Sequence, residues 1–206
     1  MATVFDKTYH IPPPKSQKLF ILTQIPLRIL AAAVTLAATS ITLTNKQTAV
    51  IYGIQIDARY SYSPALKFFA YANLIACAFT VLSLFLALIL RNKAVDSTYY
   101  FYMFLHDLVM TILLMAGCAA ATAVGYVGKY GDRHAGWMPV CGYFAEFCNR
   151  GTAASSLSYF GFLFYFILTV VSANRSAISK FDEIISRICE SKMHVLMSSN
   201  HTYFHV

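Results

Sequence analysis

Four long apolar stretches constrain this 206-residue chain more than any other feature of its sequence. They run over about residues 19–43, 66–90, 100–127 and 152–171 and contain few charges. A helix needs roughly 20 apolar residues to cross a hydrocarbon core about 30 Å thick, because each residue adds about 1.5 Å. Strands of a membrane barrel would be about ten residues long and would alternate apolar with polar side chains, which none of these stretches does. The sequence therefore predicts an all-α fold, a four-helix transmembrane bundle.

The amino-acid composition indicates the same environment. Hydrophobic residues make up 58% of the chain and charged residues only 12%. A soluble globular protein carries about 25% charged residues, because its surface must stay hydrated. The composition therefore excludes a soluble enzyme and a nucleic-acid-binding domain, although the formal net charge is +7. The high apolar fraction also excludes an intrinsically disordered chain.

The basic residues predict that the N- and C-termini are cytoplasmic, because short cytoplasmic loops are enriched in Lys and Arg. With the N-terminus inside, nine Lys and Arg side chains fall on the cytoplasmic side and six on the outer side. The predicted parts are then a Pro-containing cytoplasmic tail, a four-span membrane domain in contact with lipid, and a second cytoplasmic tail. These parts cover residues 1–18, 19–173 (with outer loops at 44–65 and 128–151) and 174–206.

The first apolar stretch has a second interpretation as a cleaved signal peptide, because it is N-terminal, flanked by basic residues and rich in alanine. Its apolar length exceeds the stretch of about 7–15 residues that is typical of signal peptides. Arg28 would shorten that apolar length, so the interpretation stays open beside the preferred membrane span.

An amphipathic helix is expected in the second tail. Apolar side chains recur there at helical spacing on one face, and charged side chains occupy the other face. The apolar set is Ile178, Phe181, Ile184, Ile185 and Ile188, and the charged set is Lys180, Asp182, Glu183 and Arg187. Such a helix either lies on the inner membrane surface or packs against the inner loop of the bundle, and the sequence favours neither placement.

Two charged side chains lie well inside the predicted spans. Arg28 is about nine residues into the first span and Asp107 about seven into the third, so both lie roughly 10–14 Å from the cytoplasmic end. An ionised side chain near the bilayer centre costs at least about 2.5–3.5 kcal/mol, and it usually faces the interior and has a partner. The sequence predicts an intramembrane ion pair between Arg28 and Asp107, in which the guanidinium offers the carboxylate a bidentate fork.

A proton or ion path through Asp107 is the alternative, because membrane relays use Asp and His side chains and His106 is adjacent. Neighbouring residues project about 100° apart on a helix, so His106 and Asp107 should not share a face. No further acid or base follows at helical spacing. The sequence favours a structural pair over a transport site.

A row of small residues, Gly117, Ala121 and Gly125, marks one face of the third span. Small side chains let the backbones of two helices approach closely in lipid. The row serves either packing within one bundle or a dimer between two bundles, and both interpretations remain open.

Cys141 and Cys148 share the second outer loop and form a candidate disulfide. On a regular helix their Cα atoms would be roughly 10 Å apart and beyond bridging range, so the loop must turn between them. Cys77 and Cys118 fall inside spans, where they are expected to be small core residues. The sequence lacks metal-ligand spacings and the common catalytic and nucleotide-binding motifs, so we expect no catalytic residue, no metal and no cofactor.

Three groups of residues resemble the plant Casparian strip membrane domain proteins and their CASP-like relatives. They are Arg28 with Asp107, the outer-loop stretch Trp137-Met-Pro-Val-Cys141 with Phe147-Cys148, and the stretch from Tyr62 to Asn73 that leads into the second span. The resemblance covers residues 20–173. The strict Casparian strip group carries a first-outer-loop signature, Glu-Ser-Leu-Pro-Phe-Phe-Thr-Gln-Phe, which is absent from this sequence. The CASP-like label therefore fits better.

The resemblance implies a MARVEL-type four-span protein of the plasma membrane, with Arg28 and Asp107 as the charged pair of the family and Cys141 and Cys148 as its outer-loop cysteines. It also implies homo- and hetero-oligomers with CASP-like proteins, which organise a membrane domain or scaffold and guide local cell-wall modification through recruited cell-wall enzymes. The predicted function is that of a non-enzymatic membrane-organising protein. The alternative is a small channel or transporter subunit that uses Asp107 in a polar path.

Overall fold

The computed structural model describes residues 15–51, 53–90 and 97–202. Four α-helices, one short 3₁₀ turn (Tyr60–Tyr62) and one two-stranded sheet make up the regular structure of these residues. The helices are α1 (Lys15–Thr44), α2 (Pro64–Leu90), α3 (Ser97–Tyr130) and α4 (Ala145–Thr202), and the strands are β1 (Lys46–Ile51) and β2 (Ile54–Arg59). All four helices contain a segment long and apolar enough to cross a membrane, so the predicted four-span helical fold is confirmed.

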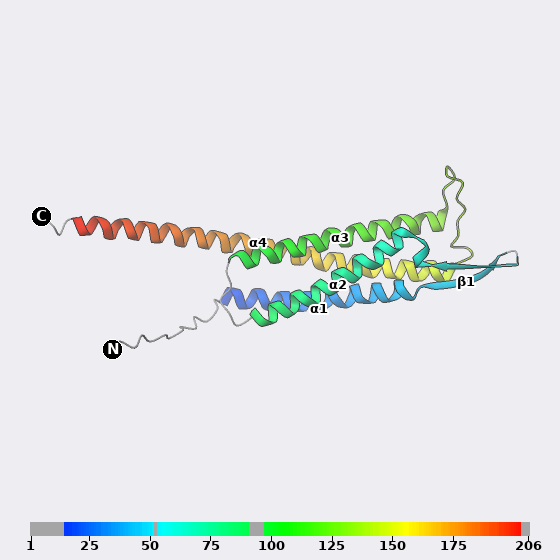
Figure 1. The fold of residues 1–206 in the computed structure, drawn as a ribbon, viewed down its shortest axis with the longest axis horizontal. Coiled ribbons are helices and arrows are strands. Elements are labelled where there is room, and N and C mark those ends of the chain that lie inside the picture. Colours follow the sequence, from blue (N-terminus) through cyan, green and yellow to red (C-terminus); the bar gives the residue numbers. More distant parts are fainter. Residues whose placement is uncertain (1–14, 52, 91–96, 203–206) are drawn as a thin grey trace.

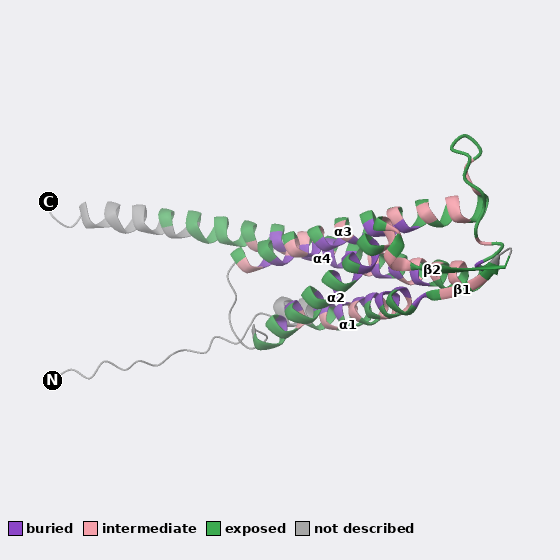
Figure 2. Cartoon of the chain, turned by 45° about the vertical axis from the view of Figure 1, so that its right-hand side comes forward, coloured by how far each residue is buried: buried purple, intermediate pink, exposed green. Residues whose placement is uncertain are grey.

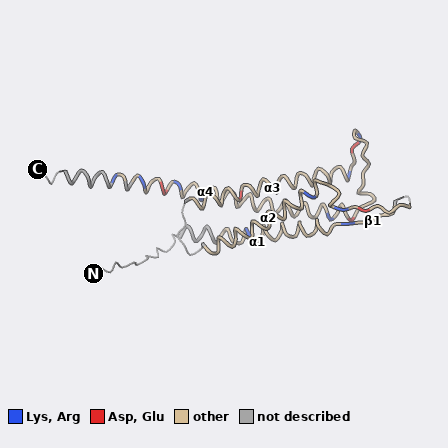
Figure 3. Tube along the Cα trace, viewed as in Figure 1, with Lys and Arg blue, Asp and Glu red and all other residues tan. Residues whose placement is uncertain are grey.

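The helices run along a common axis, with the sheet and the connection between α3 and α4 at one end of the bundle (Figure 1). In the most apolar 18 residues of each spanning helix, 33% of the residues are buried, and the buried residues form strips where the helices face one another (Figure 2). Large side chains such as Leu82 and Ile112 point outward and are exposed. Charged residues are sparse along the bundle and more frequent at the sheet end and beyond the other end (Figure 3). Lipid chains suit this apolar outer surface, because they solvate it as well as a protein interior does.

Small residues let the helices approach closely. Gly117 of α3 faces α2, where a Cβ would lie 3.1 Å from the Cβ of Ala72. Gly161 of α4 faces α1, where a Cβ would lie 3.0 Å from Cγ2 of Thr35. A Cβ at Gly125 would meet no atom within 4 Å. Gly117 therefore serves packing within the bundle, whereas Gly125 leaves the far end of the same row of small residues open.

The connection between α1 and α2 contains a β-hairpin, which the all-α prediction lacks. β1 and β2 pair antiparallel with Lys46 opposite Arg59, and Gly53 takes a positive φ of 83° in the turn. Thr48 Oγ1 donates a 2.7 Å hydrogen bond to Asp57 on the opposite strand, and this bond lowers the pKa of the Asp57 carboxyl. β2 alternates apolar and polar residues from Ile54 to Arg59, which is a strand pattern that the sequence analysis missed, whereas β1 shows no such alternation.

The fourth span and the tail helix form one continuous helix of 58 residues. The sequence predicts a separate helix in the second tail, and the structure shows that this helix is instead a continuation of the fourth span; the inner loop against which it could pack lies outside the described residues. α4 continues along the bundle axis past the ends of the other helices (Figures 1 and 2). The helix is unbroken because no Gly or Pro follows Gly161 before its end at Thr202, and these two residues are the usual helix breakers.

A buried polar network as the candidate functional site

One charged side chain of α1 and one of α3 meet inside the bundle. Nη2 of Arg28 lies 2.8 Å from Oδ2 of Asp107, and both side chains are 0% exposed. α1 and α3 begin at the same end of the bundle (Figure 1), and each charge lies a few turns from that end. The structure therefore brings together the two intramembrane charges that the sequence selects.

Three uncharged polar side chains join this pair into a network that includes all four helices. Gln24 of α1 accepts hydrogen bonds from Nε and Nη2 of Arg28 at 3.2 and 3.0 Å. Nη1 of Arg28 donates to Ser83 of α2 at 2.8 Å. Ser172 of α4 donates to Oδ2 of Asp107 at 2.8 Å and accepts from Nε2 of Gln24 at 2.8 Å. Each helix thus contributes at least one buried polar group to the network.

The contact between the two charges differs from the bidentate fork that the sequence predicts. One nitrogen of Arg28 contacts one oxygen of Asp107. The other guanidinium N–H groups are directed toward Gln24 and Ser83. The guanidinium of Arg28 therefore connects α1 to α2 through Ser83 and to α3 through Asp107. Gln24, on α1 itself, holds the guanidinium in place.

The sequence of α1 explains how one face of the helix presents this network. Gln24 and Arg28 are four residues apart, so their side chains lie on the same face of the helix. The same face continues through Ala31, Thr35 and Ala38, which are all buried. A glutamine one turn before an arginine in an apolar helix indicates a hydrogen bond between the two side chains, and the sequence analysis missed this pattern.

Ser83 and Ser172 were missed for a different reason. A serine in a spanning helix commonly satisfies its hydroxyl on the backbone of its own helix, and Ser83 also donates to the carbonyl of Thr80 at 2.9 Å. The sequence shows many hydroxyl side chains in spans and offers nothing that separates these two from the others.

His106 contacts the second oxygen of Asp107. Nδ1 of His106 lies 3.2 Å from Oδ1 of Asp107, although the helical geometry led us to expect the two residues on different faces. An angle of about 100° at the backbone still leaves the ends of two neighbouring side chains within reach. Among the described residues, Nε2 of His106 has no hydrogen-bond partner. Within the described residues, the hydrogen-bonded chain therefore does not continue beyond His106 on this side of Asp107.

The energetics of the network depend on its completeness. Removal of one partner from a buried ion pair usually costs about 3–5 kcal/mol, because the remaining charge is uncompensated. Arg28 and Asp107 each have further hydrogen-bond partners besides one another. Both buried charges are therefore stabilised by several hydrogen bonds. The network can thus fix the relative positions of four helices.

A second buried polar group lies nearer the sheet end. Ser158 of α4 donates to Oδ1 of Asn73 of α2 at 2.8 Å, and Sγ of Cys118 of α3 lies 3.2 Å from the Ser158 hydroxyl. All three side chains are buried. Cys118 thus occupies the core position expected from the sequence, and it also contacts a polar partner.

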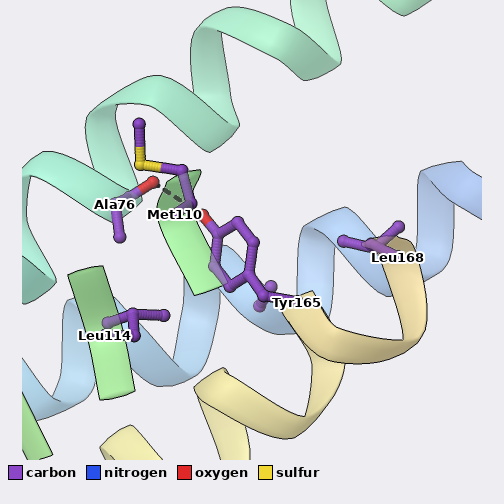
Figure 4. Packing of buried hydrophobic residues seen from close by; sticks show 6 residues of the cluster. Ala76, Met110, Leu114, Tyr165 and Leu168 are labelled. Carbon is purple, nitrogen blue, oxygen red and sulfur yellow. Dashed lines mark hydrogen bonds between the residues drawn. The ribbon is translucent and has the colours of Figure 1, made fainter. Parts of the chain in front are cut away.

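Tyr165 of α4 fills the core between these two polar groups. Its ring is fully buried with Met110, Leu114 and Leu168 (Figure 4). Its hydroxyl donates a 2.7 Å hydrogen bond to the carbonyl oxygen of Ala76 on α2. The side chain therefore combines a large apolar contact with one interhelical hydrogen bond.

The connections between α1 and α2 and between α3 and α4 are both attached to the start of α4. Cys141 and Cys148 form a disulfide with their Cα atoms 5.8 Å apart, because the chain turns before α4 begins. In the first loop, Asn45 donates to the carbonyl of Phe147 at 2.9 Å, and Gln47 accepts from the N–H of Phe147 at 2.8 Å. The disulfide segment therefore anchors the base of the hairpin.

Both charges of the network are shielded by the surrounding helices. Arg28 and Asp107 have no exposed surface. Within the described ranges, no three His, Cys, Asp or Glu side chains are grouped to hold a metal ion. The pair contacts α2 through Ser83 and α4 through Ser172, and its remaining hydrogen bonds go to Gln24 and His106 on the helices of the pair itself.

Comparison with known proteins identifies the family. The sequence profile of the family described as Casparian strip membrane protein domain matches residues 17–164. The matched region includes Arg28, Asp107, Cys141 and Cys148, and it excludes Ser172 and the extension of α4. No solved structure matches the chain.

The chain is 50% identical over 176 residues to CASP-like protein 1F1 of Vitis vinifera, and the match covers 85% of both chains. It is 46% identical over 176 residues to CASP-like protein 1F2 of Populus trichocarpa, and the match covers 85% of this chain and 97% of that relative. It is 38% identical over 152 residues to CASP-like protein 1F1 of Arabidopsis thaliana, with 73% and 87% covered. The resemblance drawn from the sequence motifs is confirmed, and the chain belongs to the CASP-like members of the Casparian strip membrane protein domain family.

Proposed function

We propose that this chain is a non-enzymatic protein of the plasma membrane that assembles with itself and with related CASP-like proteins into a membrane scaffold. In this proposal both termini are cytoplasmic, and the outer loops face the cell wall, where the scaffold positions enzymes that modify the wall. Family membership supports the proposal. The observation that carries it is the closed polar network, because both intramembrane charges are used to hold one bundle together.

A channel or transporter subunit is the second candidate, because Asp107 is a charge inside a span. A polar path requires a charged group that water or an ion can reach. Asp107 is 0% exposed, and its Oδ2 accepts from both Arg28 and Ser172. These contacts favour the scaffold.

Self-association is the result that tests the proposal. Two differently tagged copies of the full chain, expressed together and extracted in a mild detergent, are expected to co-purify. A fluorescent fusion is expected to recover slowly after photobleaching, because assembled copies diffuse slowly. An unrelated four-span protein of similar size is the control for both measurements. Copies that fail to co-purify and diffuse as fast as this control would disprove the scaffold.

Ion flux separates the two candidate functions. Liposomes that contain the purified chain are expected to take up ions no faster than empty liposomes. Flux that is present with the wild-type chain and lost with Asp107→Asn would instead establish the channel.

The proposed topology predicts which sites become glycosylated. The acceptor sequences at Asn174 and Asn200 are expected to stay unmodified in a glycosylation-competent cell, because a cytoplasmic segment does not meet the glycosylation machinery. A new acceptor in the exposed hairpin, made by Gln55→Asn with Asp57→Thr, is expected to be modified. The measurement is the change in electrophoretic mobility on deglycosidase treatment. A shift of the wild-type chain, or none for the hairpin variant, would reverse the topology.

A further inference from the structure

Among residues 15–51, 53–90 and 97–202, none covers the apolar face of the part of α4 that extends past the bundle. Near the bundle, Lys180 Nζ lies 4.5 Å from the centroid of the Phe101 ring on α3. From Phe181 to Ile188 every residue is exposed. The helix continues for about 20 residues past Lys180, which corresponds to roughly 30 Å.

Four large apolar side chains line one face of this extension. Ile178, Phe181, Ile185 and Ile188 are 52, 64, 49 and 54% exposed. They follow one another at intervals of three, four and three residues, which is the spacing of the core positions in a two-stranded coiled coil. On the opposite face, Glu183 and Arg187 form an ion pair of 2.7 Å within the helix. One pair of opposite charges is thus joined on the polar face, and no described residue covers the apolar face.

The apolar face of the extension continues the lipid-facing surface of the fourth span. Leu163, Ile167 and Val170 are exposed and lie on the same side of α4 as Ile178, because seven residues advance a helix by only about 20° less than two full turns. Asn174 is exposed on this side between the two segments. A single surface therefore runs along α4 from the span into the extension.

We infer that this surface of α4 is the interface between two copies of the chain, which pair in parallel through the extension. Copies inserted in one membrane share the same orientation, so their extensions emerge parallel and at the same height. Each core residue then faces its own counterpart, as in a symmetric parallel dimer. Asn174 faces Asn174 at the membrane boundary, where an amide hydrogen bond between helices is favourable.

A short coiled coil needs the membrane to form. Four core residues per helix are too few for stable pairing of free peptides, but anchoring in one bilayer raises the effective concentration of the two helices. The inference rests on the proposed self-assembly and names the surface that would produce it. It also assigns a role to a segment that lies outside the family-matched residues 17–164.

Cross-linking of the full chain in its native membrane tests the interface. The native cysteine of this segment is first replaced by Cys189→Ser, so that it cannot form the cross-link. Cysteine is then introduced either at Ile185 on the apolar face or at Glu183 on the opposite face. Oxidation with copper–phenanthroline is expected to yield a disulfide-linked dimer for Ile185→Cys and none for Glu183→Cys. Both positions are exposed, so neither substitution disturbs the bundle.

A second pair of variants tests the apolar character of the contact. Ile185→Glu places two like charges at one core layer, and it is expected to abolish the cross-link of a Phe181→Cys chain. Ser186→Glu, one residue along and away from the interface, is expected to leave that cross-link intact.

The outcomes separate this inference from the proposed function. Cross-links at both faces or at neither face, while two tagged copies still co-purify, would overturn the α4 interface and leave assembly through other surfaces. An unchanged cross-link with Ile185→Glu would also overturn it, in favour of contact with lipid or with another partner. Wild-type copies that do not co-purify would disprove the proposed assembly and the interface together.

Discussion

Asp107→Ala is expected to destabilise the bundle by about 3–5 kcal/mol, the range observed when one partner of a buried ion pair is removed. The substitution leaves the Arg28 guanidinium fully buried without its carboxylate, and Ser172 and His106 lose a partner at the same time. Native proteins are stable by only about 5–15 kcal/mol, so the loss is a large part of the total. Unfolding of the purified chain in mixed micelles with a rising fraction of sodium dodecyl sulfate measures the change in the free energy of unfolding.

The matched control removes both charges together. Arg28→Met with Asp107→Leu replaces the pair by apolar side chains, and such a replacement is often neutral or stabilising for a buried ion pair. The double variant is therefore expected to be clearly more stable than Asp107→Ala alone. If Asp107→Ala unfolded at the same detergent fraction as the wild-type chain, the network would not be what holds the four helices.

Exchange of the two charges is expected to rescue stability only in part. Arg28→Asp with Asp107→Arg restores opposite charges, but the new carboxylate meets the Gln24 oxygen that accepts from Arg28. The new guanidinium at position 107 lies beside His106, whose Nδ1 faces a carboxylate oxygen in the wild-type chain. The neighbouring side chains therefore favour arginine at position 28 and aspartate at position 107 over the reverse arrangement.

Tyr165→Ala is expected to cost about 3–5 kcal/mol, as is usual when a fully buried aromatic side chain is truncated. The ring is 0% exposed and packs against residues of α1, α2 and α3, so its loss leaves a cavity where the helices meet. The same detergent titration, or the temperature at which the solubilised chain aggregates, measures the destabilisation.

Tyr165→Phe is the control for this variant, because it removes the hydroxyl and keeps the ring. The carbonyl of Ala76 still accepts a 2.6 Å hydrogen bond from Thr80, so it does not become an unsatisfied group. We expect a loss of about 0.6 kcal/mol, the average for a side-chain hydrogen bond between membrane helices. A loss for Tyr165→Phe as large as that for Tyr165→Ala would mean that the hydrogen bond and not the ring holds α2 to α4.

The helices and the charged pair were predictable because the bilayer leaves few alternatives. Helices satisfy every backbone polar group inside lipid, so a long apolar stretch has one main solution. A charge in such a stretch needs a partner, and Arg28 and Asp107 were the two charges well inside the spans.

The uncharged members of the network were not predictable in this way. Thr35, Thr39 and Thr42 each donate to a carbonyl four residues earlier on α1, so a hydroxyl in a span needs no other helix. Ser83 and Ser172 look the same in the sequence. Their role follows from the rotation of α2 and α4, which periodicity alone does not determine when a helix is apolar on all sides.

Neither the hairpin nor the full length of α4 was predicted from the sequence. The hairpin rests on contacts with a distant segment, since Gln47 bonds the backbone of Phe147. The continuation of α4 rests on the absence of any helix breaker between Gly161 and Thr202, whereas the sequence analysis separated the tail from the fourth span because the apolar stretch ends at about residue 171.

The position of Gln24 on the same helix as Arg28 bears on how the chain is made. α1 is synthesised before α2, α3 and α4, so Arg28 reaches the bilayer when Ser83 and Asp107 do not yet exist. A lone arginine at such a depth costs at least about 2.5–3.5 kcal/mol on insertion scales. In the folded bundle Gln24 accepts hydrogen bonds from two N–H groups of Arg28, and it is the one partner of Arg28 in the network that is synthesised before the arginine. We therefore expect Gln24→Leu to lower the efficiency with which α1 inserts into the membrane.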